Sequence, residues 1–259
     1  MKITVLTENT SCDPAAFGCE HGLSLYIETG GHRILFDAGQ SALFAENAEK
    51  LGVDLAAVEY AVLSHGHYDH GGGLSVFLER NTAAPVYMSR YAFEKHFAGD
   101  GRDIGLNPAL QHEERIVFCG DEEEIAPGLT LYSCNEKPRS KELGDFGMTA
   151  EIGGVRVPED FRHEQYLLVR EGDRRILISG CSNKGVLDIA NWFRPDVLIG
   201  GFHLMKQALD GKLADYARRL DRLGIEFYTC HCTGEEQYAF IKPYMSRLHY
   251  IRAGMQLEV

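Results

Sequence analysis

The sequence predicts an α/β fold, and two features of the chain support this prediction. Short apolar runs rich in β-branched and aromatic residues have the length of strands and are bounded by turn-forming residues. Helical patterns, with apolar residues three and four positions apart, alternate with these runs. Four of the runs, at residues 58–63, 175–179, 196–199 and 225–229, lead to His65, Cys181, His203 and His231, respectively. Chemically capable side chains at strand ends are typical of an enzyme whose site lies on rigid supports.

The predicted elements follow one another along the whole chain. A first strand is expected at residues 1–6 and a second at 23–27. A helix is expected at 42–51, where apolar residues recur at helical spacing before Gly52. The later elements are predicted as strand 58–63, strand 85–88, helix 89–97, strand 175–179, helix 183–192, strand 196–199, helix 213–223 and strand 225–229.

One domain is expected over residues 1–259, because this length suits a large α/β unit and no linker interrupts the chain. The region at about 85–160 differs from the rest, since it holds the glycine-rich segment 99–105 and the irregular segment 135–147. Long irregular segments are often lids or binding loops. We therefore predict an insertion or lid there. The basic residues Lys137, Arg139 and Lys141 in this region suit an anionic substrate.

The charge of the chain restricts its partners. Its formal net charge of −12 argues against a nucleic-acid surface. No apolar run approaches membrane-spanning length, and residues 1–6 lack the long apolar stretch of a signal peptide. We expect a cytoplasmic protein that binds neither membrane nor nucleic acid. Its seven cysteines are expected to be reduced thiols, with Cys230 and Cys232 used for packing.

Residues 64–73 carry the strongest functional signal and read Ser-His-Gly-His-Tyr-Asp-His-Gly-Gly-Gly. Four potential metal ligands, His65, His67, Asp69 and His70, fall within this loop directly after an apolar run. Imidazole and carboxylate ligands together suit Zn²⁺, Fe or Mn²⁺. The alternative is a histidine-rich surface loop, since the chain has 11 histidines. The patterned spacing after a strand favours a metal site.

The motif His-x-His-x-Asp-His resembles the signature of the metallo-β-lactamase superfamily. The segment 34–39, Ile-Leu-Phe-Asp-Ala-Gly, is similar to an early strand of that family. The resemblance implies a four-layered αββα sandwich with metals at one edge. Within the superfamily, the chain is most similar to the branch named for the dihydropterin-ribofuranosylaminobenzene-phosphate synthases. The similar segments are 20–24, 179–182, 200–204 and 231–234.

The resemblance implies two metal positions. The implied ligands are His65, His67 and a third histidine at the first position, and Asp69, His70 and His231 at the second. The family's usual His-Thr-Pro-Gly motif, which would supply the third histidine, is missing. His163 stands roughly in its place before a strand and is a candidate for this ligand. The alternative is a solvated histidine at a strand start. Cys181 stands where the family usually has a bridging aspartate. A thiolate can ligate or bridge Zn²⁺, whereas a buried cysteine can also serve packing alone.

Other polar residues surround this predicted centre. His203 follows two glycines at a strand end and is a candidate for ligating, substrate binding or proton movement, the alternative being a core residue. His21 and Glu20 are expected to line the same cleft, with Lys137 and Arg139 as further substrate-binding candidates. Asp37 is expected to support the histidine loop by hydrogen bonding, and Asn183 replaces a histidine usual in the branch. The remaining histidines, His32, His96, His112 and His249, are expected at the surface.

The leading functional hypothesis is a metal-dependent hydrolase or related transferase that acts on a small, anionic cytosolic metabolite. One or two Zn²⁺ ions would lower the pKa of a water and stabilise developing negative charge. Asp69 would orient the nucleophile or pass its proton, beyond ligating. The synthase for which the branch is named joins two molecules, so the hypothesis includes a condensation as well as a hydrolysis. Two alternatives stay open, namely an Fe- or thiol-dependent oxidoreductase, suggested by Cys181, and a non-catalytic metal or ligand sensor.

Overall fold

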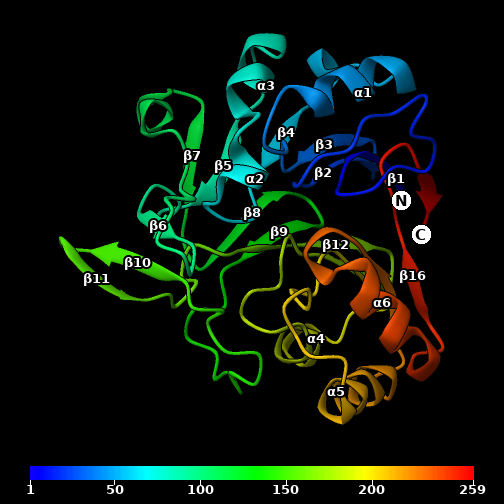
Figure 1. Cartoon of the computed structure of the whole chain (residues 1–259). Helices are drawn as coiled ribbons and strands as arrows, with labels where there is room; N and C mark the ends of the chain where they lie inside the picture. The colour runs from blue at the N-terminus through cyan, green and yellow to red at the C-terminus, as the bar shows by residue number, and fades with distance from the viewer.

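Two seven-stranded sheets form the centre of the computed structural model, which describes residues 1–259 (Figure 1). The first sheet has the order β17 (Gln256–Glu258), β1 (Lys2–Thr7), β2 (Ser24–Thr29), β3 (His32–Phe36), β4 (Tyr60–Val62), β5 (Val86–Ser89) and β7 (Ile116–Cys119). The second has the order β16 (Leu248–Tyr250), β15 (Glu226–Thr229), β14 (Val197–Ile199), β13 (Arg174–Ile178), β12 (Tyr166–Glu171), β9 (Leu129–Tyr132) and β8 (Glu122–Ala126). A small third sheet contains β11 (Val155–Pro158), β10 (Thr149–Ile152) and β6 (Lys95–Phe97).

Helices cover the outer face of each large sheet (Figure 1). The helices α1 (Leu43–Leu51) and α3 (Leu74–Arg80) pack on the first sheet. The helices α4 (Val186–Phe193), α5 (Gly211–Asp221) and α6 (Glu235–Ile241) pack on the second. The short helix α2 (Tyr68–Gly71) and the 3₁₀ turns η1 (Leu55–Ala57), η2 (Pro108–His112), η3 (His231–Thr233) and η4 (Lys242–Tyr244) complete the elements. The prediction of a four-layered αββα sandwich is confirmed.

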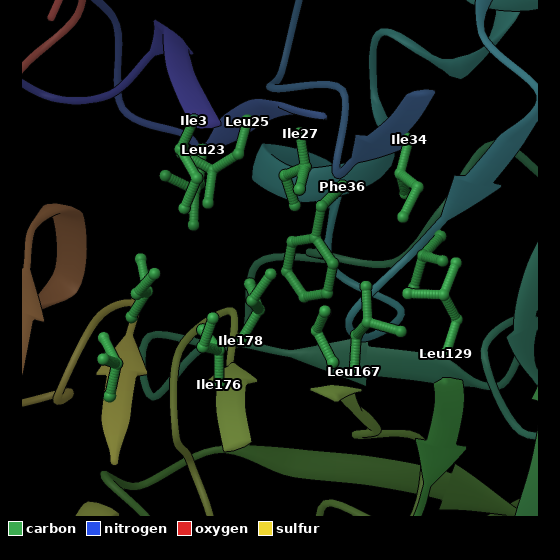
Figure 2. Close-up of a cluster of buried hydrophobic side chains, with 14 of the residues drawn as sticks. Ile3, Leu23, Leu25, Ile27, Ile34, Phe36, Leu129, Leu167, Ile176 and Ile178 are labelled. Atoms are coloured by element: carbon green, nitrogen blue, oxygen red, sulfur yellow. The ribbon is translucent and has the colours of Figure 1, made fainter. Parts of the chain in front are cut away.

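The central strands of the two large sheets, such as β3, β12 and β13, carry apolar runs because both of their faces are buried. In β3, the side chains of Ile34 and Phe36 enter the core between the sheets, and Leu35 points to the helices. In β13, Ile176 enters the same core, where it lies opposite residues of the first sheet (Figure 2). Alternate side chains therefore supply two separate cores from one strand.

The parallel parts of the two large sheets place their carboxyl ends at the site. The strands β3, β4, β5 and β7 run parallel, as do β13, β14, β15 and β16. The loop after β4 holds His65 and His70. Cys181 follows β13, His203 follows β14 and His231 follows β15. Gly200, after β14, has φ +141°, and a Cβ there would lie 1.7 Å from the carbonyl oxygen of Ser179. Only glycine allows these two loops to approach so closely.

Two of the predicted elements differ in the structure. The predicted helix at 89–97 is wrong: β5 ends at Ser89, and residues 95–97 form β6, which pairs with β10. Hydrogen bonding to a strand more than fifty residues away overrides the local helical pattern there. The helix predicted at 183–192 begins only at Val186, because the preceding residues form the turn that carries Cys181. None of the helices has the length and apolar character that crossing a membrane requires.

Candidate metal centre

The predicted metal-binding and catalytic residues gather at the strand ends. They are His65, His67, Asp69, His70, His163, Cys181, His203 and His231, and each is more than nine-tenths buried. Ligand atoms of His65, His70 and Cys181 lie within 4.8 Å of one another. The same holds for His21, Asp69 and His231. The structure thus brings together side chains that are up to 210 positions apart, from His21 to His231.

His70 and His231 point their free ring nitrogens at each other. His70 donates its Nδ1–H to Asp37 Oδ2 at 2.7 Å, and His231 donates its Nδ1–H to Asn9 Oδ1 at 2.7 Å. In the neutral rings each Nε2 therefore carries a lone pair, and the two Nε2 atoms lie 3.2 Å apart. Asp69 Oδ2 lies 3.3 Å from His231 Nε2, and Cys181 Sγ lies 3.2 Å from His70 Nε2. These donor atoms fit a cation, because imidazole, carboxylate and thiolate all ligate Zn²⁺.

Asp37 fixes the histidine loop, as the sequence predicts. Its Oδ1 accepts the Ser64 N–H at 2.7 Å, and its Oδ2 accepts the Ser64 hydroxyl at 2.8 Å. Ser64 Oγ in turn accepts the Nδ1–H of His65 at 2.8 Å, which leaves His65 Nε2 buried and without a partner. A Cβ on Gly180 would lie 2.1 Å from Ser64 Oγ, so the loop of Cys181 needs glycine to reach this position. One carboxylate thereby orients both His65 and His70.

Burial favours the neutral form of most imidazoles at the site. Burial lowers the pKa of His231 to about 4, although Asp69 raises it, and burial is also the leading cause that lowers the pKa values of His67 and His203 to about 3. Burial opposes ionisation of Asp69, but His70 and His231 hold the pKa of this carboxyl well below its usual range. His70 differs, because the neighbouring carboxylates outweigh burial and raise its pKa. His67, His203 and His231 are therefore favoured in the neutral form that metal ligands require, whereas a metal binding at His70 would displace its second ring proton.

Two residues at the end of β1 take part in the site and were missed by the sequence analysis. Asn9 Oδ1 accepts a hydrogen bond from His231 Nδ1–H, and Asn9 Nδ2 donates to His21 Nδ1 at 3.3 Å. His21 then presents its Nε2–H to Asp69 Oδ2 at 3.3 Å. Glu8, fully buried, accepts the backbone N–H of His231 at 3.1 Å, and burial raises its pKa. No spacing pattern links these two residues to the distant His231, so no sequence signal indicated them.

Cys232 lies beside Cys181 and His203, and the packing role predicted for this buried residue stays a prediction. The strand ends before it and the 3₁₀ turn η3 begins at His231, so the alternation expected of a strand does not continue. The ligand atoms of Cys232, Cys181 and His203 lie within 4.8 Å of one another. Cys230 does pack in the core between the sheets, as predicted.

Phe146 stacks on the ring of His203, with the ring centroids 3.9 Å apart.

His96 is fully buried, so its predicted place at the surface is wrong. It lies on β6 and stacks on His163 with ring centroids 3.8 Å apart. His163 is also fully buried, which excludes the alternative of a solvated histidine. The ligand atoms of these two residues, His67 and Glu159 lie within 4.8 Å of one another. Of the other three histidines predicted at the surface, His112 and His249 are exposed and His32 is half-buried.

Three predicted substrate-binding residues lie outside these clusters. The carboxylate of Glu20 accepts hydrogen bonds from the backbone N–H groups of Gln40 and Ser41 at 3.1 and 3.2 Å, so it shapes that loop. Lys137 is exposed on the segment 135–147. Arg139, on the same segment, donates to the carbonyl oxygen of Asp160 at 2.8 Å. Arg139 lines a cavity of about 250 Å³ together with Lys141, Glu159, Phe161, Asn183 and Lys184, among others.

Comparison with known proteins agrees with this geometry. The family model of the metallo-beta-lactamase superfamily matches residues 17–226. The chain is similar to the crystal structure of Tm1679, a metal-dependent hydrolase of the beta-lactamase superfamily, with 30% identity, a TM-score of 0.83 and coverage of 100% of this chain and 99% of that chain. It is 28% identical over 283 residues to the 7,8-dihydropterin-6-methyl-4-(beta-D-ribofuranosyl)-aminobenzene-5'-phosphate synthase of Methanocaldococcus jannaschii, covering 98% of this chain and 95% of the synthase. It is 27% identical over 242 residues to the uncharacterized protein MJ0448 of the same organism, covering 90% of each. The chain belongs to the metallo-β-lactamase superfamily.

Proposed function

We propose that this protein is a metal-dependent hydrolase, or a related transferase, that acts on a small anionic metabolite. The observation that carries the proposal is the pair of facing nitrogens, His70 Nε2 and His231 Nε2, 3.2 Å apart beside Asp69 and Cys181. We propose one or two Zn²⁺ ions, and Fe or Mn²⁺ suit the same nitrogen and oxygen donors. When bound, the metal would supply a Lewis acid that polarises a substrate oxygen and acidifies a water.

The residues around this point have distinct roles in the proposal. The proposed metal ligands are His65, His67, Asp69, His70, Cys181 and His231. His21 donates its Nε2–H to Asp69 Oδ2, which holds the carboxylate in one orientation. The ionised Asp69 would then orient a nucleophile by accepting a hydrogen bond from its O–H group. His203, whose Nδ1 is buried and unpartnered, is proposed to bind a polar group of the substrate or move a proton.

The substrate is proposed to be anionic because basic residues lie on the segment beside the site. Arg139 and Lys141 on that segment line the cavity of about 250 Å³, whose lining also includes the carboxylates of Glu142, Asp145, Glu159, Asp160 and Asp188. Lys137 lies on the same segment. Lys137 and Lys141 are the cations proposed to attract a carboxylate or phosphate of the substrate. The similar synthase is named for a 5'-phosphate, which is consistent with such a substrate.

Removal of the metal tests this proposal. Protein freed of metal by a chelator is expected to lose activity toward a panel of phosphoesters, phosphodiesters, thioesters and lactones, and to regain it with added Zn²⁺, Mn²⁺ or Fe²⁺. Elemental analysis before and after chelation measures the bound metal. Activity that persists without metal would refute the proposed mechanism, and a protein that never takes up metal would refute the proposed function.

The segment 135–147 is proposed to cover the site, and Phe146→Ala tests this. Phe146 stacks on His203, and losing such an aromatic contact costs about 0.5–1.5 kcal/mol. This loss would destabilise the closed position of the segment and weaken substrate binding. We therefore expect KM to rise by about 2- to 10-fold, with a smaller change in kcat. Phe118→Ala, at an exposed residue of β7, is the matched control. Unchanged kinetics in the Phe146 variant would contradict the proposed cover.

One observation favours a redox enzyme as a second candidate. Cys181, Cys232 and His203 offer two soft sulfur donors and one nitrogen within 4.8 Å. Thiolate ligands suit iron as well as zinc. A visible absorption spectrum separates the two candidates, because Fe–thiolate absorbs in the visible range and Zn²⁺ does not.

A further inference from the structure

A second cluster of buried histidines lies beside the proposed metal centre. Its members are His67, His96, Glu159 and His163. His96 belongs to β6 of the small sheet, and Glu159 directly follows β11 of the same sheet. His67 belongs to the loop that also carries His65, so the cluster adjoins the proposed centre. The small sheet therefore delivers two buried polar groups to the metal-binding loop.

The hydrogen bonds of His96 leave one of its nitrogens ready to ligate. Its Nδ1 lies 2.7 Å from Glu159 Oε2. A carboxylate accepts, so His96 donates Nδ1–H, and its Nε2 carries the lone pair in the neutral ring. That Nε2 is buried and has no hydrogen-bond partner. A carboxylate on one ring nitrogen and a free lone pair on the other is the arrangement in which metal-bound histidines are commonly held.

The hydrogen bonds of His163 have the opposite effect. The backbone N–H of Gly66 donates to His163 Nδ1 at 2.8 Å. Because a backbone N–H is always a donor, Nδ1 holds the lone pair and the neutral ring carries its proton on Nε2. That Nε2 lies 3.7 Å from Glu159 Oε1. In this tautomer His163 offers no lone pair to a metal at Nε2.

His67 faces His96 and has an unsatisfied nitrogen of its own. The two ring centroids lie 5.5 Å apart, and His67 Nε2 is buried without a partner. Unpaired polar atoms in a protein interior are costly, and a bound cation between His67 and His96 would satisfy both nitrogens.

We propose that His96, oriented by Glu159, supplies a ligand nitrogen to the cation held by His67, and that His163 holds the Gly66 loop instead of ligating. This inference rests on the proposed metal-dependent function and names a ligand for it. A divalent cation such as Zn²⁺ is the expected occupant, since imidazoles supported by a carboxylate suit it. The region at about 85–160 would then complete the metal site in addition to covering it.

Matched asparagine variants test the division of roles. His96→Asn keeps an N–H where Nδ1 donates to Glu159 and removes Nε2. His163→Asn keeps an acceptor for the Gly66 N–H and removes Nε2 there. His70→Asn, at the proposed centre, is the reference. Each metal-free protein is titrated with Zn²⁺ alone by calorimetry, its zinc content is measured, and its thermal unfolding without metal reports whether the fold is kept.

The His96→Asn variant is expected to lose zinc from one position or bind it at least about 100-fold more weakly, whereas His163→Asn keeps wild-type stoichiometry. Glu159→Gln is expected to weaken the same position about 10- to 100-fold. Zinc loss in His163→Asn, alone or together with His96→Asn, would overturn the inference. Full zinc binding in both variants would also overturn it, and loss in His70→Asn would then leave the proposed function intact. Full binding in His70→Asn as well would count against the proposed function itself.

Discussion

Replacing His70 with alanine is expected to abolish activity and remove most of the bound metal while the fold is kept. His70 Nε2 lies 3.2 Å from both His231 Nε2 and Cys181 Sγ, so its loss opens the centre of the proposed site. Loss of a residue that merely supports a ligand costs about 10- to 100-fold in affinity, and loss of a ligand should exceed this. Asp37 keeps its two hydrogen bonds from Ser64, so the loop stays anchored. The measurements are metal content by elemental analysis, activity and circular dichroism.

His65→Ala is expected to behave in the same way, because His65 Nε2 is buried and unpartnered at the same centre. His112→Ala, at an exposed histidine of η2, is the control for removal of an imidazole. Full metal occupancy in both the His65 and His70 variants would contradict the assignment of this loop as a metal site.

The variants of Cys181 are expected to diverge. Cys181→Asp should retain two metals, because a carboxylate can span two cations about 3.5–4 Å apart. Cys181→Ala should lose occupancy at one position, because a methyl group cannot ligate. The structure supports this expectation, since the Cys181 sulfur is buried and lies 3.2 Å from His70 Nε2. Metal content of the two variants, measured side by side, is the test.

The competing view treats Cys181 as a packing residue. On that view Cys181→Ala keeps its metals, and the buried charge of Cys181→Asp destabilises the protein by several kcal/mol. Thermal unfolding of the metal-free variants separates the two views, and a stable Ala variant with full metal content would decide for packing.

The sequence predicted the parts of the site that follow strands in a local pattern. The loop of His65 and His70 follows an apolar run. Cys181 and His231 come three and two residues after the strands β13 and β15, and the family resemblance implied their roles as ligands. Parallel pairing then brings strand ends together, so proximity follows from the fold. Asp37 could be placed for the same reason, since β3 pairs with β4.

Residues whose position depends on distant pairing could not be predicted. His96 lies on a three-residue strand whose neighbour in the sheet, Ala150, is 54 positions away, and nothing local marks that strand. Asn9 reaches His231 across 222 positions. The proximity of Cys232 to Cys181 and His203 was not foreseen, because the chain turns into η3 where a continued strand was expected. In each case a tertiary contact decides what the local pattern leaves open.

A crystal structure of the metal-loaded protein, with diffraction recorded at the zinc and iron absorption edges, tests the central claim most directly. The account predicts an anomalous peak between His70 and His231, at the metal–nitrogen distance of about 2.0–2.1 Å from both Nε2 atoms. The edge at which the peak appears identifies the metal. A metal-loaded crystal with no peak between these two nitrogens would contradict the account.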